Sequence, residues 1–350
     1  MELQLFINEN PDYVDIFKKR GLKVMKYTAK DLILVKNFRD KPLKFKDESD
    51  YWIMYCRGVV IDTLNDKVIC LPPVKSIIRE SADLTFHGGE IQFLIDGTMI
   101  NLFYREEWIL STRSEIGGRN KWINNKSFKE MFFECSELEL DSLDKNCSYS
   151  FVMRHKDNRN VSPIIKNEIV LVEMYRYSDT IERLHSGEYP DTSKIKNESL
   201  ISLEKLDSLW SIGGYLIKEG SKRYKVENPG FERVKSLKIN VNNELLNYIE
   251  LRQNGNLIEY LKYFPEKSKL FERYRNKIHK LSNELYNSYK NLYILKKIKK
   301  KDIPYYLKPL VTDIHKKYLS SNEKTTWIVI KTYIHCIPSK KLAYAINYVI

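Results

Sequence analysis

Alternating apolar residues between Gly88 and Gly118 restrict the fold of this chain more than any other stretch of its sequence. Alternation with a period of two is typical of a β-strand that buries one face. Asp-Gly at positions 96–97 favours a tight turn, and two further extended segments follow, Met99–Tyr104 and Trp108–Arg113. The stretch therefore predicts a β-meander. The residues that alternate at its start are Ile91, Phe93 and Ile95.

The segment Phe-Leu-Ile-Asp-Gly-Thr, followed by a Ser-Thr-Arg strand that ends at Arg113, resembles the nucleotide-binding centre of the covalent nucleotidyltransferases. These are ATP-dependent RNA and DNA ligases and messenger-RNA capping enzymes, and the likeness is strongest to RNA ligases of the phage T4 ligase-1 type. The resemblance implies an α+β fold, in which a nucleotidyltransferase (ligase/capping-enzyme-like) domain of antiparallel sheets plus helices is followed by an all-α domain.

The family motif is Lys-x-Asp-Gly, and its lysine amine attacks the α-phosphate of ATP and carries AMP as a phosphoramidate. Leu94 stands at the position of that lysine, and the chain has no lysine between Lys75 and Lys121. A leucine side chain has no lone pair and cannot form this bond. The resemblance is therefore to an enzyme whose nucleophile is missing.

Other family motifs follow the same order along the chain. Arg57-Gly58 precedes a predicted hairpin that ends in Pro-Pro-Val-Lys75, so Arg57 and Lys75 are candidates to contact nucleotide phosphates. The resemblance places Val152, which follows the aromatic Phe151, where active members have a glutamate that reaches the ribose.

Two further motifs lie later in the chain. Gly213 replaces the glutamate that coordinates the divalent metal in active members. Lys225 retains the first lysine of a Lys-x-Lys motif, and Glu227 replaces the second. A negative charge at 227 would repel a phosphate. The resemblance thus implies no catalytic residue and no metal site, with relics of a nucleotide pocket at Arg57, Lys75, Asp96, Gly97, Arg113, Phe151 and Lys225.

The charge of the chain is concentrated in its last third. Residues 235–350 hold 23 Lys and Arg against 9 Asp and Glu, a net charge of +14, whereas residues 1–234 have a net charge of −1. We expect two domains, a nucleotidyltransferase-like domain at 1–234 and a basic all-helical domain at 235–350. Phosphate neutralisation favours nucleic acid as the partner of such a surface, although a lysine-rich solvated surface is the alternative interpretation.

Apolar spacings of three and four residues predict helices at Asn242–Tyr263, Glu266–Lys300 and Lys340–Tyr348. Tyrosines interleaved with lysines there are either core residues or stacking surfaces for bases, and they are Tyr286, Tyr289, Tyr293, Tyr305 and Tyr306. The candidate RNA-binding residues are Arg273, Arg275, Lys277, Lys280, Lys296, Lys297, Lys299, Lys300 and Lys301.

Several shorter elements are also expected. A helix is predicted at Tyr13–Arg20 and another at Lys126–Cys135, and the polar stretch 180–206 suggests a further helix with its loop. Strands are predicted at Leu22–Tyr27, Asp31–Phe38 and Glu168–Arg176.

The five cysteines have no metal-like spacing, and the sequence shows neither a signal peptide nor an apolar run long enough for a bilayer. A reducing cytoplasmic compartment and no membrane partner are expected, and the residue bias is compatible with a large DNA virus. The leading hypothesis is a catalytically inactive RNA-ligase-like protein that binds RNA (tRNA-like or RNA ends) or an RNA-processing protein. The alternatives are an active enzyme that uses ATP and Mg²⁺ with Lys75 as a relocated nucleophile, and an assembly subunit without a nucleic-acid role.

Overall fold

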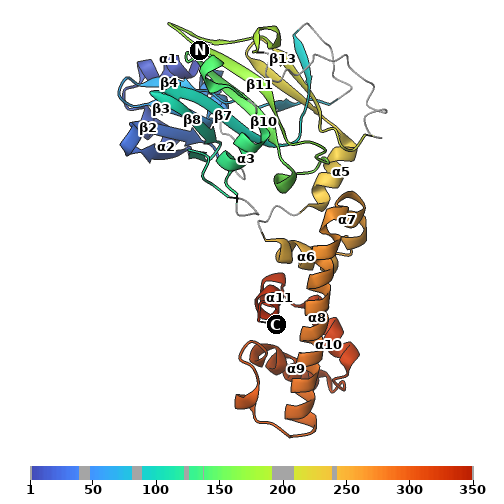
Figure 1. Cartoon of the computed structure of the whole chain (residues 1–350). Coiled ribbons are helices and arrows are strands. Elements are labelled where there is room, and N and C mark those ends of the chain that lie inside the picture. Colours follow the sequence, from blue (N-terminus) through green and yellow to red (C-terminus); the bar gives the residue numbers. More distant parts are fainter. Residues whose placement is uncertain are drawn as a thin grey trace. The chain divides into compact units, whose positions relative to one another are not determined.

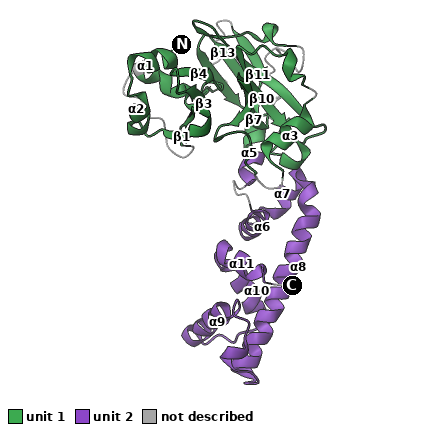
Figure 2. Ribbon diagram, turned by 60° about the vertical axis from the view of Figure 1, so that its left-hand side comes forward, with its two compact units in different colours: residues 1–233 green, residues 234–350 purple. Residues whose placement is uncertain are grey.

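The computed structural model describes residues 2–38, 48–80, 89–121, 126–136, 138–190, 209–238 and 243–348. The chain divides into two compact units, unit 1 at Met1–Arg233 and unit 2 at Val234–Ile350 (Figure 2). The sequence placed this boundary after residue 234. Unit 1 contains three sheets and unit 2 is helical, so the predicted order of antiparallel sheets with helices followed by a helical region is confirmed.

A six-stranded sheet forms the centre of unit 1 (Figure 1). Its order is β12-β11-β10-β7-β8-β9, and all neighbouring strands are antiparallel. One of its faces packs against helix α3 (Phe128–Cys135), whose first turn is closed by a capping box between Ser127 and Glu130. The strands are β7 Thr98–Arg105, β8 Glu107–Thr112, β9 Glu115–Ile116, β10 Cys147–Arg154, β11 Glu168–Tyr177 and β12 Ile181–Arg183.

A smaller sheet of four strands has the order β5-β14-β13-β6. The β5–β14 pair is parallel and the other pairs are antiparallel. One face of this sheet is apolar, because Tyr215, Ile217, Tyr224 and Val226 form a cluster there. The strands are β5 Ile77–Ile78, β6 Glu90–Phe93, β13 Gly214–Glu219 and β14 Lys222–Glu227.

The third sheet pairs β1 to β4 in sequence order, and helices α1 and α2 cover it. Aromatic rings fill the interface, where the rings of Phe6 and Trp52 stack with centroids 4.1 Å apart. The elements are α1 Glu2–Glu9, α2 Tyr13–Lys19, β1 Lys23–Tyr27, β2 Leu32–Lys36, a 3₁₀ helix Glu48–Tyr55, β3 Arg57–Asp62 and β4 Lys67–Cys70.

The predicted meander is wrong at its first turn. Strands β7, β8 and β9 do form a meander, but β6 pairs with β13 in the small sheet and not with β7. Asp96-Gly97 therefore connects two sheets and does not close a hairpin. The polar stretch expected to be helical after residue 180 begins instead with strand β12, and residues 191–206 lie outside the described part of the chain.

Helices α6, α9, α10 and α11 pack along the long helix α8 in unit 2 (Figure 2). The predicted helix 242–263 is interrupted after Asn254, where Gly255 has a φ of 76°. The predicted helix 266–300 is also shorter: it ends in a π-helical turn, Lys290–Ile294, before Lys296 adopts a φ of 53°. The helices are α5 Pro229–Leu237, α6 Glu244–Gln253, α7 Leu257–Tyr263, α8 Ser268–Tyr289, α9 Lys308–Ser321, α10 Trp327–Cys336 and α11 Ser339–Ile346.

In the described part of the chain, none of the helices combines the length and apolar composition needed to cross a membrane.

Candidate functional site

Leu94 lies directly after β6, and its backbone N–H donates to the carbonyl oxygen of Gly214 over 2.8 Å. This bond holds Leu94 against the start of β13. A Cβ atom built on Gly213 would lie 2.7 Å from the Leu94 carbonyl oxygen and 3.2 Å from its Cγ. The positions that the resemblance gives to the nucleophilic lysine and to a metal-binding glutamate are therefore neighbours. Between them the backbone leaves no room for a side chain at 213.

Asp96 fixes the connection between the two sheets. Its Oδ2 accepts hydrogen bonds from the backbone N–H groups of Val161 and Ser162, at 2.7 and 2.8 Å. The side-chain amide of Asn160 donates to the carbonyl oxygen of Gly97 over 2.8 Å. A carboxylate with two backbone donors is a strong local anchor, so Asp96 has a structural task in this chain.

Aliphatic side chains fill the position that the resemblance gives to the ribose-binding glutamate. Val152 is only 6% exposed and packs with Val172, while Ile95, Met99 and Val170 lie against them. Gly97 approaches so closely that a Cβ there would lie 2.5 Å from Cγ1 of Val152. The surroundings of Val152 are therefore apolar, at a position where the resemblance implies a carboxylate.

Lys225 forms an ion pair with Glu227 two residues further along β14. Both side chains are partly exposed, and the backbone of Glu227 pairs with that of Gly214 across the sheet. Glu227 therefore neutralises Lys225, the lysine that the resemblance assigns to phosphate binding. The expected repulsion of a phosphate is joined by a second effect, because the remaining lysine already has an internal counter-ion.

Arg57 is the first residue of β3, and Arg113 lies in the turn between β8 and β9, where its backbone approaches Gly58. A Cβ on Gly58 would be 2.8 Å from the Cα of Arg113, and Gly58 has a φ of 105°. The Arg113 guanidinium donates to Asn37, at 2.6 Å to Oδ1 and 3.1 Å to the carbonyl oxygen. Lys75 follows β4 and is half-buried, and its backbone N–H donates to the carbonyl oxygen of Met54.

Phe151, which the resemblance assigns to a nucleotide pocket, lies in the interior of unit 1. Its ring is fully buried against α3, with its centroid 5.6 Å from that of Phe132. Neighbouring residues of a strand point to opposite faces, so Phe151 and Val152 cannot both line one pocket.

A buried ionic cluster next to these residues was missed from the sequence. Lys218 on β13 donates from Nζ to the Val172 carbonyl oxygen at 2.7 Å and lies 2.8 Å from Oε2 of Glu173 on β11. Arg223 and Arg183 lie 3.8 and 3.9 Å from the same carboxylate. Burial raises the pKa of Glu173, but the charges of Lys218 and Arg223 outweigh it, and the net pKa is below the ordinary glutamate value. The cluster fastens the small sheet to the large one.

One group of potential metal ligands occurs among the described residues. Glu134, His155 and Asp157 bring ligand atoms within 4.8 Å of one another. The Nζ of Lys126 lies 2.7 Å from the Glu134 carboxylate and 3.1 Å from that of Asp157. A lysine cation thus already balances these carboxylates, in agreement with a structural role.

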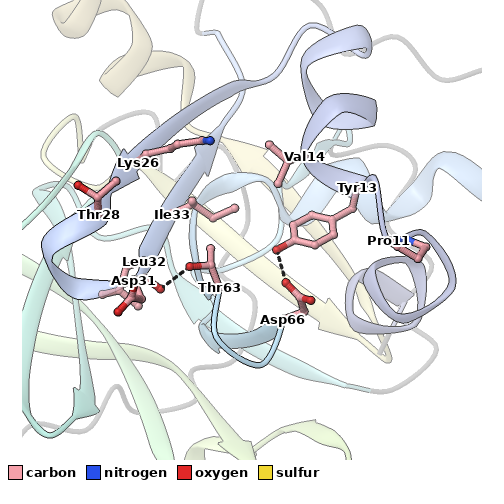
Figure 3. A pocket seen from close by; sticks show the side chains of 10 residues that line it. All are labelled: Pro11, Tyr13, Val14, Lys26, Thr28, Asp31, Leu32, Ile33, Thr63 and Asp66. Carbon is pink, nitrogen blue, oxygen red and sulfur yellow. Dashed lines mark hydrogen bonds between the residues drawn. The ribbon is translucent and has the colours of Figure 1, made fainter.

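A pocket of about 340 Å³ lies elsewhere in unit 1, between α2 and strands β1 and β2 (Figure 3). Tyr13 donates from its hydroxyl to Asp66 over 2.7 Å, and Thr63 donates to the carbonyl oxygen of Asp31. None of the predicted nucleotide-site residues lines this pocket.

All nine candidate RNA-binding residues of unit 2 are exposed. On α8, Arg273, Lys277 and Lys280 recur at spacings of four and three, opposite the face that buries Phe271, Ile278 and other core residues. Of the interleaved tyrosines, Tyr289 is a core residue at 3% exposure, whereas Tyr305 is 55% exposed. The core interpretation therefore holds for Tyr289 and does not hold for Tyr305.

Comparison with known proteins gives limited likeness. No family profile matches the sequence. A curated protein of Invertebrate iridescent virus 3, "Immediate-early protein ICP-46 homolog", is 26% identical over an alignment of 218 residues, with 57% of this chain and 49% of the relative covered. The chain thus spans about half the length of that relative.

Among solved structures, the chain is similar to a putative ATP-dependent DNA ligase from Aquifex aeolicus, with a TM-score of 0.43 and 13% identity over 80% of this chain and 81% of the ligase. It is also similar to an archaeal ATP-dependent RNA ligase, with a TM-score of 0.42 and 12% identity over 75% of this chain and 69% of that one.

Proposed function

We propose that this chain is an RNA-binding protein whose nucleotidyltransferase-like unit, of the phage T4 ligase-1 type, no longer transfers AMP. The observation that carries the proposal is the contact between Leu94 and Gly213. Covalent nucleotidyl transfer needs an amine within reach of the α-phosphate and a divalent ion to neutralise the triphosphate. At these two neighbouring positions the chain has a hydrocarbon side chain and no side chain.

The surrounding contacts support the loss, because they are made by groups that a nucleotide would need. Lys225 is paired with Glu227, and Asp96 is used by two backbone amides. The apolar packing around Val152 gives a ribose no hydrogen-bonding partner. Restoring the lysine alone would therefore leave the other requirements unmet.

Binding of RNA is proposed for unit 2 from its charge and exposure. Residues 235–350 have a net charge of +14, and the nine candidate residues are solvent-accessible. Lysine and arginine at phosphates release counterions, which supplies affinity without sequence specificity. An intracellular site of action, in the compartment where RNA is found, is part of this proposal.

The adenylation test uses purified full-length protein, α-labelled ATP and Mg²⁺ or Mn²⁺. We expect no labelled band from the unaltered chain, from Lys75→Ala or from Leu94→Lys. A band that disappears in Lys75→Ala would establish the alternative of an active enzyme with a relocated nucleophile. A band from Leu94→Lys alone would show that the rest of the pocket is competent and would contradict our account of Gly213 and Glu227.

The binding test is a gel shift with a transfer-RNA-like RNA and with a single strand at moderate salt. We expect a salt-sensitive complex with at least one of them. Absence of any complex with either RNA would overturn the binding half of the proposal and favour an assembly subunit.

A further inference from the structure

Four tyrosine rings meet at the surface of unit 2. Tyr348 is at the centre: its ring centroid lies 5.0 Å from that of Tyr305, 5.1 Å from that of Tyr344 and 5.6 Å from that of Tyr306. Tyr305 and Tyr344 meet it edge to face. We call these four residues the tyrosine cluster.

The tyrosine cluster is not a core. Tyr305, Tyr344 and Tyr348 are 55%, 50% and 41% exposed, although burial of a tyrosine ring away from water is favourable. On α11 the residues on both sides of Tyr344 are buried, so the helix turns this one ring outward. Contiguous exposed aromatic surface marks an interaction site.

Another aromatic group in the same unit shows the contrast. Tyr260 is 1% exposed, Phe264 and Phe271 are 2% exposed, and the ring of Tyr260 stacks with both of the others in the interior. Unit 2 thus buries some of its aromatic side chains, whereas the rings of the tyrosine cluster stay exposed.

Exposed lysines precede Tyr305 in the sequence, and another lies beside Tyr344 on α11. Lys299, Lys300 and Lys301 are exposed and lie in the segment that leads into Tyr305. Lys340 is exposed and lies one helical turn before Tyr344 on α11, so the two side chains share a helix face.

The acidic groups of these elements have protein partners. Asp302 accepts a hydrogen bond from the backbone of Lys299, and Glu284 accepts one from the Tyr306 hydroxyl. Asp313 on α9 is paired with Lys341. The exposed charge beside the tyrosine rings is therefore positive.

We infer that the tyrosine cluster is a stacking site for unpaired bases of single-stranded RNA, with Lys300, Lys301 and Lys340 at the backbone phosphates. The inference rests on the proposed RNA binding and names its place and the class of RNA. Every base presents a π-face, so aromatic rings beside cations hold single strands with little sequence preference. A duplex keeps its bases stacked on one another and offers only phosphates.

The test measures anisotropy of a labelled oligouridylate of about twelve nucleotides with full-length protein, and repeats it with the corresponding blunt duplex. In Tyr305→Ala/Tyr344→Ala we expect binding of the single strand to weaken by about tenfold or more, because stacking on a ring is lost. Binding of the duplex should change by less than about twofold. Tyr305→Phe/Tyr344→Phe, which keeps both rings, should bind the single strand as the unaltered chain does. Ile328→Ala, at a side chain on α10 that is 71% exposed, is the surface control.

A second readout separates stacking from structural damage. A 2-aminopurine base within the strand changes its fluorescence when it stacks on a ring, and we expect this change in the unaltered and Phe proteins but not in the Ala variant. Thermal melting checks that each variant folds.

The outcomes of the two proposals differ. If the Ala variant binds the single strand unchanged, or if the Phe variant loses as much binding as the Ala variant, stacking at this cluster is refuted while RNA binding stands. If the unaltered chain binds neither RNA, the proposed function fails and the inference fails with it.

Discussion

The candidate nucleotide site of unit 1 and the surface around Tyr305 in unit 2 differ in whether their polar groups have partners within the protein. In unit 1, Lys225 is paired with Glu227, Asp96 with two backbone amides, and Lys218 with Glu173. In unit 2 the lysines before Tyr305 and the tyrosine rings themselves are exposed. Groups that could bind a nucleotide hold unit 1 together, whereas comparable groups in unit 2 are available to a ligand.

The largest expected effect breaks unit 1 at its buried ionic cluster. Glu173→Leu leaves Lys218, which is fully buried, without its counter-ion, and we expect a loss of about 3–5 kcal/mol in the free energy of unfolding. Chemical denaturation followed by the tryptophan signal measures it. A loss below about 1 kcal/mol would show that the two sheets are held by other contacts.

The same cluster gives a pH dependence of stability. The pKa of Glu173 in the folded protein is below its ordinary value of 4.5, so its contribution is complete above that value and is lost as the pH falls through the folded pKa. Stability of the unaltered chain should fall between neutral pH and pH values below about 4 more steeply than that of Glu173→Leu. Parallel curves for the two proteins would contradict this assignment.

The next effect tests the exposed charge of unit 2. If about five basic side chains contact phosphates of a single strand, affinity should fall about 100-fold between 50 and 200 mM salt. The slope of the logarithm of the affinity against the logarithm of salt concentration measures this. A flat salt dependence would mean that the basic residues are a solvated surface and do not contact RNA.

A smaller effect tests the contact at Leu94. A Cβ at 213 would meet the Leu94 carbonyl oxygen at 2.7 Å, so Gly213→Ala should cost about 1–3 kcal/mol of stability. Gly187→Ala is the matched control, since a Cβ there meets nothing within 4 Å. Leu94→Ala should not rescue Gly213→Ala, because the obstructing atom belongs to the backbone. Equal stabilities of the two glycine variants would refute the close approach.

The smallest effect tests individual phosphate contacts in unit 2. Lys300→Ala/Lys301→Ala should weaken RNA binding several-fold and lower the magnitude of the salt slope by about 1.4. Glu272→Ala on α8, which removes an exposed acid, should not lower it. An unchanged slope in the lysine variant would place the phosphate contacts elsewhere on unit 2.

Much of unit 1 could be predicted from local pattern. The strand ending at Tyr27, the strand around Leu34 and the helix that ends at Cys135 lie where local pattern places them. Ser127 and Glu130 form a capping box, which can be recognised in the sequence. Helix α1 was not predicted, because its eight residues bury only Leu3 and Ile7, too few to establish a period.

Long-range pairing set the limits of prediction. Asp96-Gly97 has the composition of a hairpin turn, but β6 finds its partner in β13, more than a hundred residues later. Glu173 lies in a run that is otherwise apolar, and its counter-ion Lys218 is 45 residues away. The closeness of Leu94 to Gly213 was implied only by the family resemblance, since no local pattern relates these two residues.

The most direct measurement is the intact mass of the unaltered full-length chain after incubation with ATP and Mg²⁺ or Mn²⁺. Our account predicts one species at the mass of the protein alone, because Leu94 offers no amine and Lys225 is paired with Glu227. A stoichiometric species heavier by one adenylate would contradict it.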